Sequence, residues 1–381
     1  MKPKQSTRIT LVLADLACGG VQRVVLTLAR GLAQRGFDLT VVTLSDHAPD
    51  FFPLPAGISR ASVPLRTRRR RGVVNFFRNA VGRLRLMRQT LVATQPDVII
   101  THGAQINVLA MIALRGLKYP VLVTEHGDKP TRDAVSRHWH WRKWLAYRAR
   151  RILYQSAFRV VSVSRAIDRA FAWLPAERRA VIYNPFTAPP VDSPPFDLPV
   201  GASPDRPWLL SMGRLTHAKG FDVLLAAFAR VAAKFPEWQL VIVGDGALRE
   251  PLRQLAHGLN LKGRVVFAGA IPHPPSVLRR AQIFVMASRY EGFPMAHGEA
   301  LACGLPVVAT DCPTRPGDGR SAGGVDELVR HGVDGLLVPS EDPEGLASAM
   351  ATLMGDAALR SRFAQRAPEV VYNTHATRAP A

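Results

Sequence analysis

The repeated order of apolar runs, glycine turns and amphipathic stretches is the feature that most constrains the fold of this chain. Residues 8–15 form a short apolar run that we expect to be a buried strand, and a turn at Gly19 and Gly20 follows it. Apolar residues then recur with a helical period from 21 to 34, and the next apolar run spans 37–44. A strand, a crossover helix and a second strand are the opening of a parallel doubly wound sheet.

The second half of the chain repeats this order, and a proline-rich stretch separates the halves. Eight prolines fall between Pro185 and Pro207, where neither a strand nor a helix can continue. A chain of 381 residues also exceeds the usual size of one core. We predict two doubly wound parallel-sheet (Rossmann-like) α/β domains that face each other across a cleft, at residues 1–190 and 207–381, with a linker at 191–206. Further strands are expected at 97–102, 121–124, 158–163, 208–212, 240–244, 264–268, 283–287 and 307–310, and helices at 221–233, 295–303, 343–354 and up to 367.

The segment from Ser288 to Asp311 contains two carboxylates, Glu291 and Glu299, eight positions apart. Glu291 opens a predicted turn after a strand, and Glu299 falls about one turn inside the predicted helix at 295–303. The start of a helix has free N–H groups and a partial positive charge, which suit a phosphorylated ligand. Three interpretations remain open: a hydrolytic acid/base pair, two acceptors for the hydroxyls of ribose and sugar, or solvated helix charges.

A basic loop follows the strand at 208–212. Arg214 and Lys219 are five positions apart in it, flanked by Gly213 and Gly220 at the start of a helix. A planar guanidinium fork and a compact ammonium charge together suit a diphosphate, although a solvated loop is the alternative.

Two histidines, His102 and His126, stand at the carboxyl ends of predicted strands. Ligands collect at that edge in open α/β sheets. A lone histidine is usually structural, and the turn at Gly19 and Gly20 could be no more than a tight connection, so the sequence alone does not decide their roles.

Three segments together resemble the retaining family-4 glycosyltransferases, also called glycosyl transferases group 1, which have the GT-B fold. Glu291-Gly-Phe-Pro through Glu299 to Asp311 is similar to the E-x7-E segment of that family. Gly213-Arg214 through Lys219-Gly-Phe-Asp is similar to its phosphate-binding segment, and Gly19-Gly20-Val-Gln-Arg-Val to its glycine loop.

This resemblance implies that a sugar is transferred with retention from a nucleotide-sugar, a UDP-sugar in our interpretation. Glu299 would accept hydrogen bonds from ribose, Glu291 and the backbone after it would hold the sugar, and Arg214 and Lys219 would neutralise the departing diphosphate. His126 would contact the sugar from the first domain. The catalytic residues implied are Glu291, His126, Lys219 and Arg214, and the donor-binding residues are Gly19, Gly20, Arg214, Lys219, Gly244, Gly246, Ile271, Glu291, Gly292, Phe293, Pro294 and Glu299. Two cations at the diphosphate, and no convincing Asp-x-Asp pair, lead us to expect no metal and no other cofactor.

The net charge of +21 implies an anionic partner. Basic and aromatic residues mix at 66–88 and again at 132–151, as in helices that lie at a membrane interface. A solvated helix face and core packing of the Trp residues are the alternatives. We expect a glycan or lipid-linked acceptor of the cell envelope and a cytoplasmic protein peripheral to the anionic inner-membrane surface. No motif for specific nucleic-acid binding is visible, and the three cysteines suggest neither disulfides nor a zinc site.

Two regions depart from the family pattern. The loop at 312–324 is longer than in relatives, and the segment after 369 is short for a helix that would cross back onto the first domain. Two alternatives to the transferase therefore stay open: a nucleotide-sugar epimerase or hydrolase on the same fold, and a degenerate, non-catalytic binding homologue.

Overall fold

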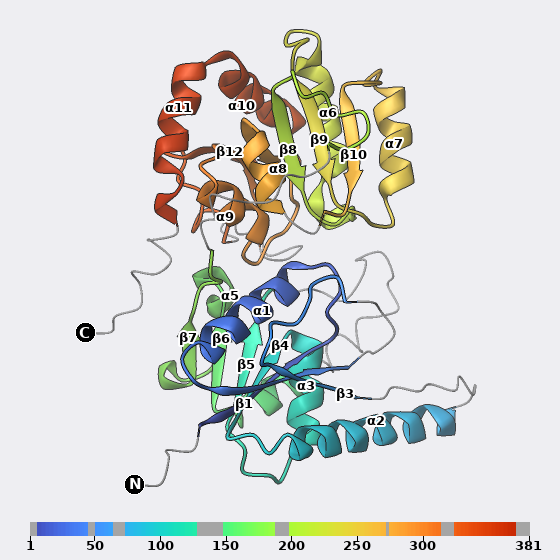
Figure 1. Ribbon diagram of the computed structural model, residues 1–381, viewed down its shortest axis with the longest axis vertical. Helices are drawn as coiled ribbons and strands as arrows, with labels where there is room; N and C mark the ends of the chain where they lie inside the picture. Colours follow the sequence, from blue (N-terminus) through green and yellow to red (C-terminus); the bar gives the residue numbers. More distant parts are fainter. Residues whose placement is uncertain are drawn as a thin grey trace. The chain divides into compact units, whose positions relative to one another are not determined.

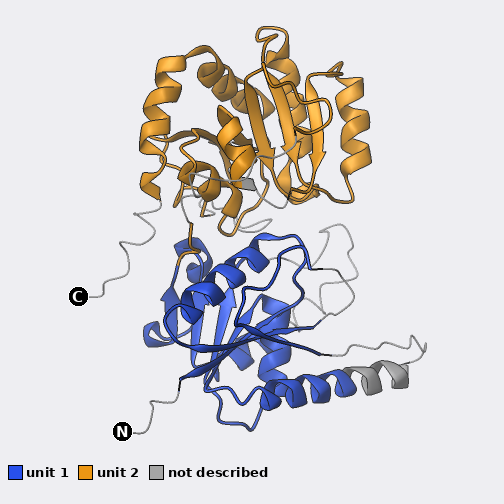
Figure 2. Cartoon of the chain, in the orientation of Figure 1, with its two compact units in different colours: residues 1–182 blue, residues 183–381 orange. Residues whose placement is uncertain are grey.

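The chain divides into two compact units, residues 1–182 and 183–381, in a computed structural model (Figure 2). The structure describes residues 6–44, 50–63, 73–127, 148–186, 198–271, 274–313 and 324–370. The predicted linker at 191–206 lies partly outside these ranges, and its bounds stay a prediction. The basic run at 66–71, most of the segment 132–151 and most of the loop 312–324 also lie outside them.

The first unit is a parallel sheet with strand order β3-β2-β1-β4-β5-β6-β7 (Figure 1). Leu11, Val12 and Leu13 are all buried, so both faces of its central strand are covered. Val25 and Ala29 of the first helix pack into that core. The strands are β1 (Arg8–Leu13), β2 (Asp38–Thr43), β3 (Ser59–Ser62), β4 (Val98–His102), β5 (Val121–Glu125), β6 (Arg159–Ser162) and β7 (Arg179–Val181). The helices are α1 (Gly20–Ala33), α2 (Val73–Ala93), α3 (Ala104–Ala113), α5 (Arg165–Arg169) and the short η2 (Ala176–Arg178).

The second unit repeats the plan with strand order β10-β9-β8-β11-β12-β13, again parallel throughout. Its core is built on Trp208 and Phe228, both fully buried, and the helices that follow β8 and β13 pack against each other. The strands are β8 (Trp208–Met212), β9 (Gln239–Val243), β10 (Val265–Gly269), β11 (Ile283–Met286), β12 (Val307–Asp311) and β13 (Gly335–Pro339). The helices are η3 (His217–Lys219), α6 (Phe221–Ala232), α7 (Arg249–Gly258), α8 (Pro274–Arg280), α9 (Met295–Ala302), α10 (Pro343–Gly355) and α11 (Ala357–Arg366).

The predicted fold class, two parallel α/β sheets of the doubly wound kind, is confirmed. Each predicted strand occurs within two residues of its expected ends. The edge strands β3, β7 and β13 were not predicted. Ser164, which precedes α5, accepts a hydrogen bond from the backbone N–H of Ile167 at 3.1 Å and so caps that helix.

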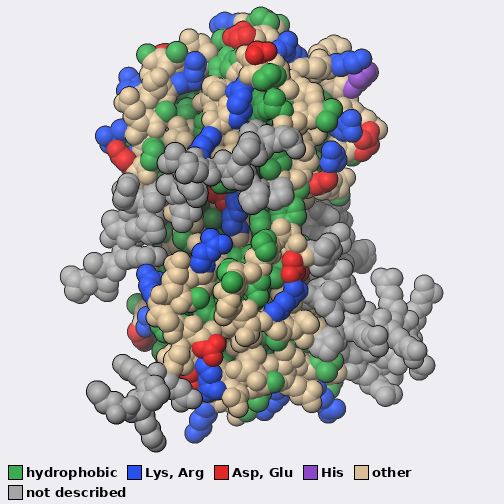
Figure 3. All heavy atoms as spheres, in the orientation of Figure 1, with side chains coloured by type: hydrophobic (Ala, Val, Ile, Leu, Met, Phe, Trp, Pro, Cys, Tyr) green, Lys and Arg blue, Asp and Glu red, His purple; other side chains and the backbone are tan. Residues whose placement is uncertain are grey.

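On the face drawn in Figure 3, Lys and Arg side chains occur on both units. Among the residues that the structure describes, no helix combines the length and the apolar composition that a bilayer crossing requires.

Candidate functional site

The sheet of the second unit reverses its winding beside β8, and this is where a ligand is expected. The strand β8 lies between β9 and β11, so the chain winds outward from it in both directions. Ligands of open α/β sheets bind outside the carboxyl ends of the strands at such a switch point. The loop after β8 carries Lys219 and the loop after β11 carries Glu291. The topology therefore brings the two predicted segments to one edge.

Lys219 and Glu291 are in direct contact at this edge. The ammonium group of Lys219 forms an ion pair with Oε1 of Glu291, and the hydroxyl of Ser288 donates to the same oxygen at 2.7 Å. Glu291 is buried. Burial alone raises the pKa of its carboxyl, but the charge of Lys219 and the hydrogen bonds that it receives bring the pKa below its ordinary value. Glu291 is thus an ionised acceptor beside a cation.

His297 lies on α9 close to this pair, and our sequence reasoning did not single it out. The ring is buried, and its Nδ1 has no hydrogen-bond partner within the described residues. It packs edge-on against Phe284, with ring centroids 5.5 Å apart. Burial lowers the pKa of His297 to about 4, so the ring is neutral at neutral pH. Only its place between Glu291 and Glu299 could have drawn attention to it in the sequence.

The turn before α9 is held by stacked aromatic rings. Phe293 stacks between Tyr183 and Phe186, with centroid distances of 5.3 Å and 5.6 Å. A Cβ at Gly298 would come within 2.2 Å of the Phe186 ring, so only glycine fits there. The phenol of Tyr183 also donates to Glu327 at 2.8 Å. These contacts fix the backbone that leads from Glu291 into the helix.

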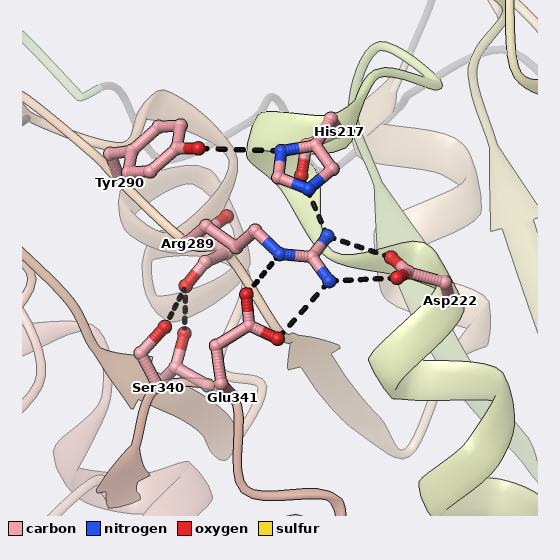
Figure 4. Close-up of polar contacts among 8 residues, drawn as sticks. His217, Asp222, Arg289, Tyr290, Ser340 and Glu341 are labelled. Carbon is pink, nitrogen blue, oxygen red and sulfur yellow. Dashed lines mark hydrogen bonds and ion pairs between the residues drawn. The ribbon is translucent and has the colours of Figure 1, made fainter. Parts of the chain in front are cut away.

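The loops after β8 and β11 are tied together by Arg289 (Figure 4). Its guanidinium donates to both oxygens of Asp222, at 2.8 Å and 2.7 Å, to both oxygens of Glu341, and to the carbonyl of His217 at 2.9 Å. We call Arg289 and these three partners the Arg289 cluster. The Arg289 side chain is 8% exposed, and its hydrogen bonds to Asp222 raise its pKa further above its ordinary value. The cluster holds the loop of Lys219 next to the loop of Glu291.

Glycines allow the neighbouring strand-end loops to approach closely. A Cβ at Gly244 would lie 2.0 Å from the carbonyl oxygen of Gly213, and one at Gly246 would lie 2.5 Å from that of Leu215. A Cβ at Gly220, where φ is +60°, would lie 1.9 Å from the carbonyl oxygen of Ala287. The loops after β8, β9 and β11 are therefore packed backbone to backbone. Lys219 directly precedes Gly220 in this packed segment.

The other ligand residues predicted in the second unit do not take part in the ion pair between Lys219 and Glu291. Arg214 is exposed on the loop after β8, and Ile271 follows β10 at the border of the described range. Glu299 is half-buried on α9, one turn beyond Met295, as the spacing predicted. The ligand roles of Arg214, Glu299, Gly244, Gly246, Ile271, Gly292, Phe293 and Pro294 stay predictions.

The first unit has a switch point of its own, between β1 and β4. Gly19 and Gly20 follow β1, and Gly20 is the first residue of α1. His102 ends β4 and His126 follows β5, and their rings touch: Nδ1 of His102 lies 3.2 Å from Nε2 of His126. The sequence placed both histidines at this edge but did not predict their contact. The approach of His126 and of the glycine turn to the donor stays a prediction.

A metal centre is not apparent in the described part of the chain. The residues that the structure describes contain no group of three or more His, Cys, Asp or Glu arranged to hold a metal ion.

Two family models match successive parts of the chain. Residues 18–188 match Glycosyltransferase Family 4, and residues 197–370 match Glycosyl transferases group 1. An exopolysaccharide phosphotransferase of Streptomyces coelicolor is 40% identical over 157 residues, which are 41% of this chain and 16% of that protein. The lipopolysaccharide core biosynthesis glycosyltransferase LpsE of Rhizobium meliloti is 28% identical over 361 residues, which are 93% of this chain and 91% of that protein.

A solved structure that matches this chain over both units supports the fold assignment. HepE of Anabaena, crystallised with UDP and glucose, has a TM-score of 0.71 to this chain at 22% identity, and the match covers 97% of this chain and 98% of that one.

Proposed function

Because this chain belongs to the retaining glycosyltransferases of family 4, with the GT-B fold, we propose that it moves a sugar from a UDP-sugar to a cell-envelope glycan or a lipid-linked acceptor. The observation that carries the donor half of this proposal is the Lys219–Glu291 ion pair at the switch point of the second sheet. The fold and the family leave the sugar and the acceptor open.

Lys219 and Glu291 exchange partners when the donor binds. Without a ligand, each charge neutralises the other, so the site does not hold an isolated buried charge. A diphosphate carries more negative charge than a carboxylate and takes over the ammonium group of Lys219, together with the exposed guanidinium of Arg214. The carboxylate of Glu291 is then available to hydroxyl groups of the sugar. Glu299 is half-buried on α9, one helical turn beyond the start of that helix. Its carboxylate accepts hydrogen bonds from the ribose hydroxyls.

The chemical contribution of the two cations is electrostatic. When the bond between the anomeric carbon and the phosphate oxygen breaks, negative charge grows on the diphosphate. Fixed positive charges at that position stabilise the transition state more than the ground state. Their fixed position depends on the Arg289 cluster and on the close packing at Gly220.

A nucleotide-binding experiment tests the donor. UDP and UDP-glucose should raise the melting temperature of the chain, whereas ADP and GDP should raise it less. At a hundredfold excess of ligand over Kd, the stabilisation is about 2.7 kcal/mol. Differential scanning fluorimetry with this panel measures the shift, and equal shifts for all three diphosphates would contradict the preference for UDP.

The transfer itself is measured as UDP release with and without candidate acceptors. We expect release to depend on an acceptor glycan or lipid-linked sugar. Release without any acceptor would favour the hydrolase or epimerase alternative. Tight UDP binding with no turnover for any acceptor would favour the non-catalytic homologue.

The acceptor proposal rests on the relatives named above and on the surface of the first unit. The helix α2 exposes Val81 and Leu86 beside Arg83 and Arg85. Arg88 does not belong to this surface, because it donates to the carbonyls at the end of α3, at 3.0 Å and 2.9 Å. A helix that exposes basic and apolar side chains together suits an anionic membrane surface. We propose that the enzyme is cytoplasmic and peripheral to the anionic inner-membrane surface, and this exposed helix supports the membrane contact.

Vesicle flotation tests this placement. Vesicles with anionic lipid should carry the chain to the top of the gradient at low salt, and zwitterionic vesicles should not. Substitution of Arg83 and Arg85 by Gln should reduce flotation, because each basic residue near the surface contributes about 1 kcal/mol. Substitution of Arg230 and Lys262 in the second unit by Gln is the matched control. Equal flotation with both kinds of vesicle would remove the electrostatic proposal.

A further inference from the structure

The two histidines of the first unit form a pair whose hydrogen atoms can be assigned. Nδ1 of His102 lies 3.2 Å from Nε2 of His126 and 2.9 Å from the hydroxyl oxygen of Thr124. The hydroxyl of Thr124 also contacts the carbonyl oxygen of Thr101. His102 is 3% exposed, and its ring is tilted by 37° from that of His126. Such a closely packed polar group permits few arrangements of hydrogens.

The assignment starts from the carbonyl of Thr101. A carbonyl oxygen can only accept, so the single hydrogen of the Thr124 hydroxyl is used in that bond. In the contact between Thr124 and His102, the hydroxyl oxygen must therefore accept, and Nδ1 of His102 must carry the hydrogen that it donates. That hydrogen also faces Nε2 of His126, as in a three-centre hydrogen bond.

The tautomer of His126 follows from this. Nε2 of His126 cannot carry a hydrogen, because it would point at the N–H of His102. A neutral imidazole without a hydrogen on Nε2 carries it on Nδ1. The imidazolium form of His126 has hydrogens on both nitrogens and is disfavoured for the same reason. Burial, and then the neighbouring His126, hold the pKa of His102 well below its ordinary value, so the His102 ring is neutral.

We propose that His102 is a positioning residue that holds His126 in the neutral tautomer with its hydrogen on Nδ1. Thr124 orients His102 by accepting from its Nδ1. The consequence for catalysis rests on the proposed function and on the contact of His126 with the donor sugar that the family resemblance implies. In that role His126 acts as a neutral group instead of a charged acid.

Nuclear magnetic resonance of the full-length chain tests the assignment directly. The chain has eleven histidines, so the ring signals of His126 are identified in a ¹⁵N-histidine-labelled sample by their loss in the His126→Gln variant. Long-range ¹H–¹⁵N correlation spectra should show a protonated Nδ1 and an unprotonated Nε2 for His126 at neutral pH. A protonated Nε2, or an imidazolium at neutral pH, would overturn the proposal.

Matched variants separate positioning from a general loss of structure. Thr124→Val removes the hydroxyl with little change in shape, and Thr124→Ser keeps it. His102→Leu removes the ring nitrogen, and the amide of His102→Asn places a donor where Nδ1 stood. We expect the signals of His126 to become a mixture of tautomers in the Val and Leu variants and to stay close to the wild-type pattern in the Ser and Asn variants. An unchanged His126 spectrum in the Val and Leu variants would also overturn the proposal.

Turnover of the same variants distinguishes this inference from the function on which it rests. We expect kcat to fall about tenfold in the Val and Leu variants and to recover in the Ser and Asn variants, which is the scale of one misplaced hydrogen bond. If the tautomer changes as expected and kcat does not, the positioning role of His102 stands. The contact of His126 with the sugar is then wrong.

Discussion

Replacing Lys219 by alanine should lower sugar transfer about a hundredfold to a thousandfold while leaving the fold intact. The scale is that of removing one fixed donor from a site where negative charge develops. The Lys219 side chain forms an ion pair with Glu291 and is partly exposed at the edge of the sheet. Its removal therefore leaves no cavity in the hydrophobic core. The loss should fall on kcat with UDP-sugar as donor, since the charge on the diphosphate is greatest in the transition state.

The control for this variant is Lys262→Ala, which removes an exposed lysine of the same unit. It should have the wild-type kcat and the same net charge as Lys219→Ala, so a general electrostatic effect is accounted for. Circular dichroism checks that both variants are folded. Near-wild-type turnover of Lys219→Ala would contradict the role assigned to the ion pair.

The same substitution should change how stability depends on pH. In the wild type, the pKa of Glu291 is depressed, so its ion pair stabilises the fold above the ordinary pKa of 4.5, and this contribution is lost as pH falls through the folded pKa. Without Lys219, burial is no longer outweighed by that charge, and the pKa of Glu291 should rise. The variant is then least stable relative to the wild type near neutral pH, and the difference shrinks on acidification towards pH 4.5. Urea unfolding at several pH values measures this difference.

The strands that are clearest in the sequence are those whose side chains are buried on both faces. β9 reads Gln-Leu-Val-Ile-Val and β1 ends in Leu-Val-Leu, because helices cover both sides of a parallel sheet. The edge strand β3 reads Ser-Arg-Ala-Ser and is paired on one side only, so no apolar run marks it. β13 is a short edge strand that ends in Pro339, which interrupts the pattern.

The candidate site could be predicted where its residues belong to a sequence motif that follows a predicted strand. Lys219 and Glu291 each belong to a segment with a motif, and both segments lie at the carboxyl ends of strands that were predicted. The Arg289 cluster was not predicted, because Glu341 comes from the loop after β13, a strand that the sequence did not reveal. The contact between His102 and His126 depends on the register of β4 against β5, which periodicity does not determine.

Replacing Arg289 by methionine should strongly destabilise the second unit. Its guanidinium is buried, and it connects α6, the loop of η3 and the segment after β13 through Asp222, the carbonyl of His217 and Glu341. Breaking a buried ion pair by removing one partner costs about 3–5 kcal/mol. The carboxylates of Asp222 and Glu341 are half-exposed and regain some hydration, so we expect the lower end, about 3 kcal/mol. Urea unfolding, followed by the fluorescence of the buried Trp208, measures it.

Combined substitutions separate two effects of removing Arg289: the loss of its hydrogen bonds, and the repulsion between the two carboxylates that are left without a cation. Without Arg289, the carboxylates of Asp222 and Glu341 face the same vacated position with like charge. Adding Asp222→Asn and Glu341→Gln to Arg289→Met should therefore recover part of the stability that the single change loses, because neither amide repels the other. Arg289→Lys keeps the charge but not the fork, so it should fall between wild type and Arg289→Met. If the triple variant is less stable than Arg289→Met, the cluster acts through its hydrogen bonds alone and repulsion between the carboxylates contributes nothing.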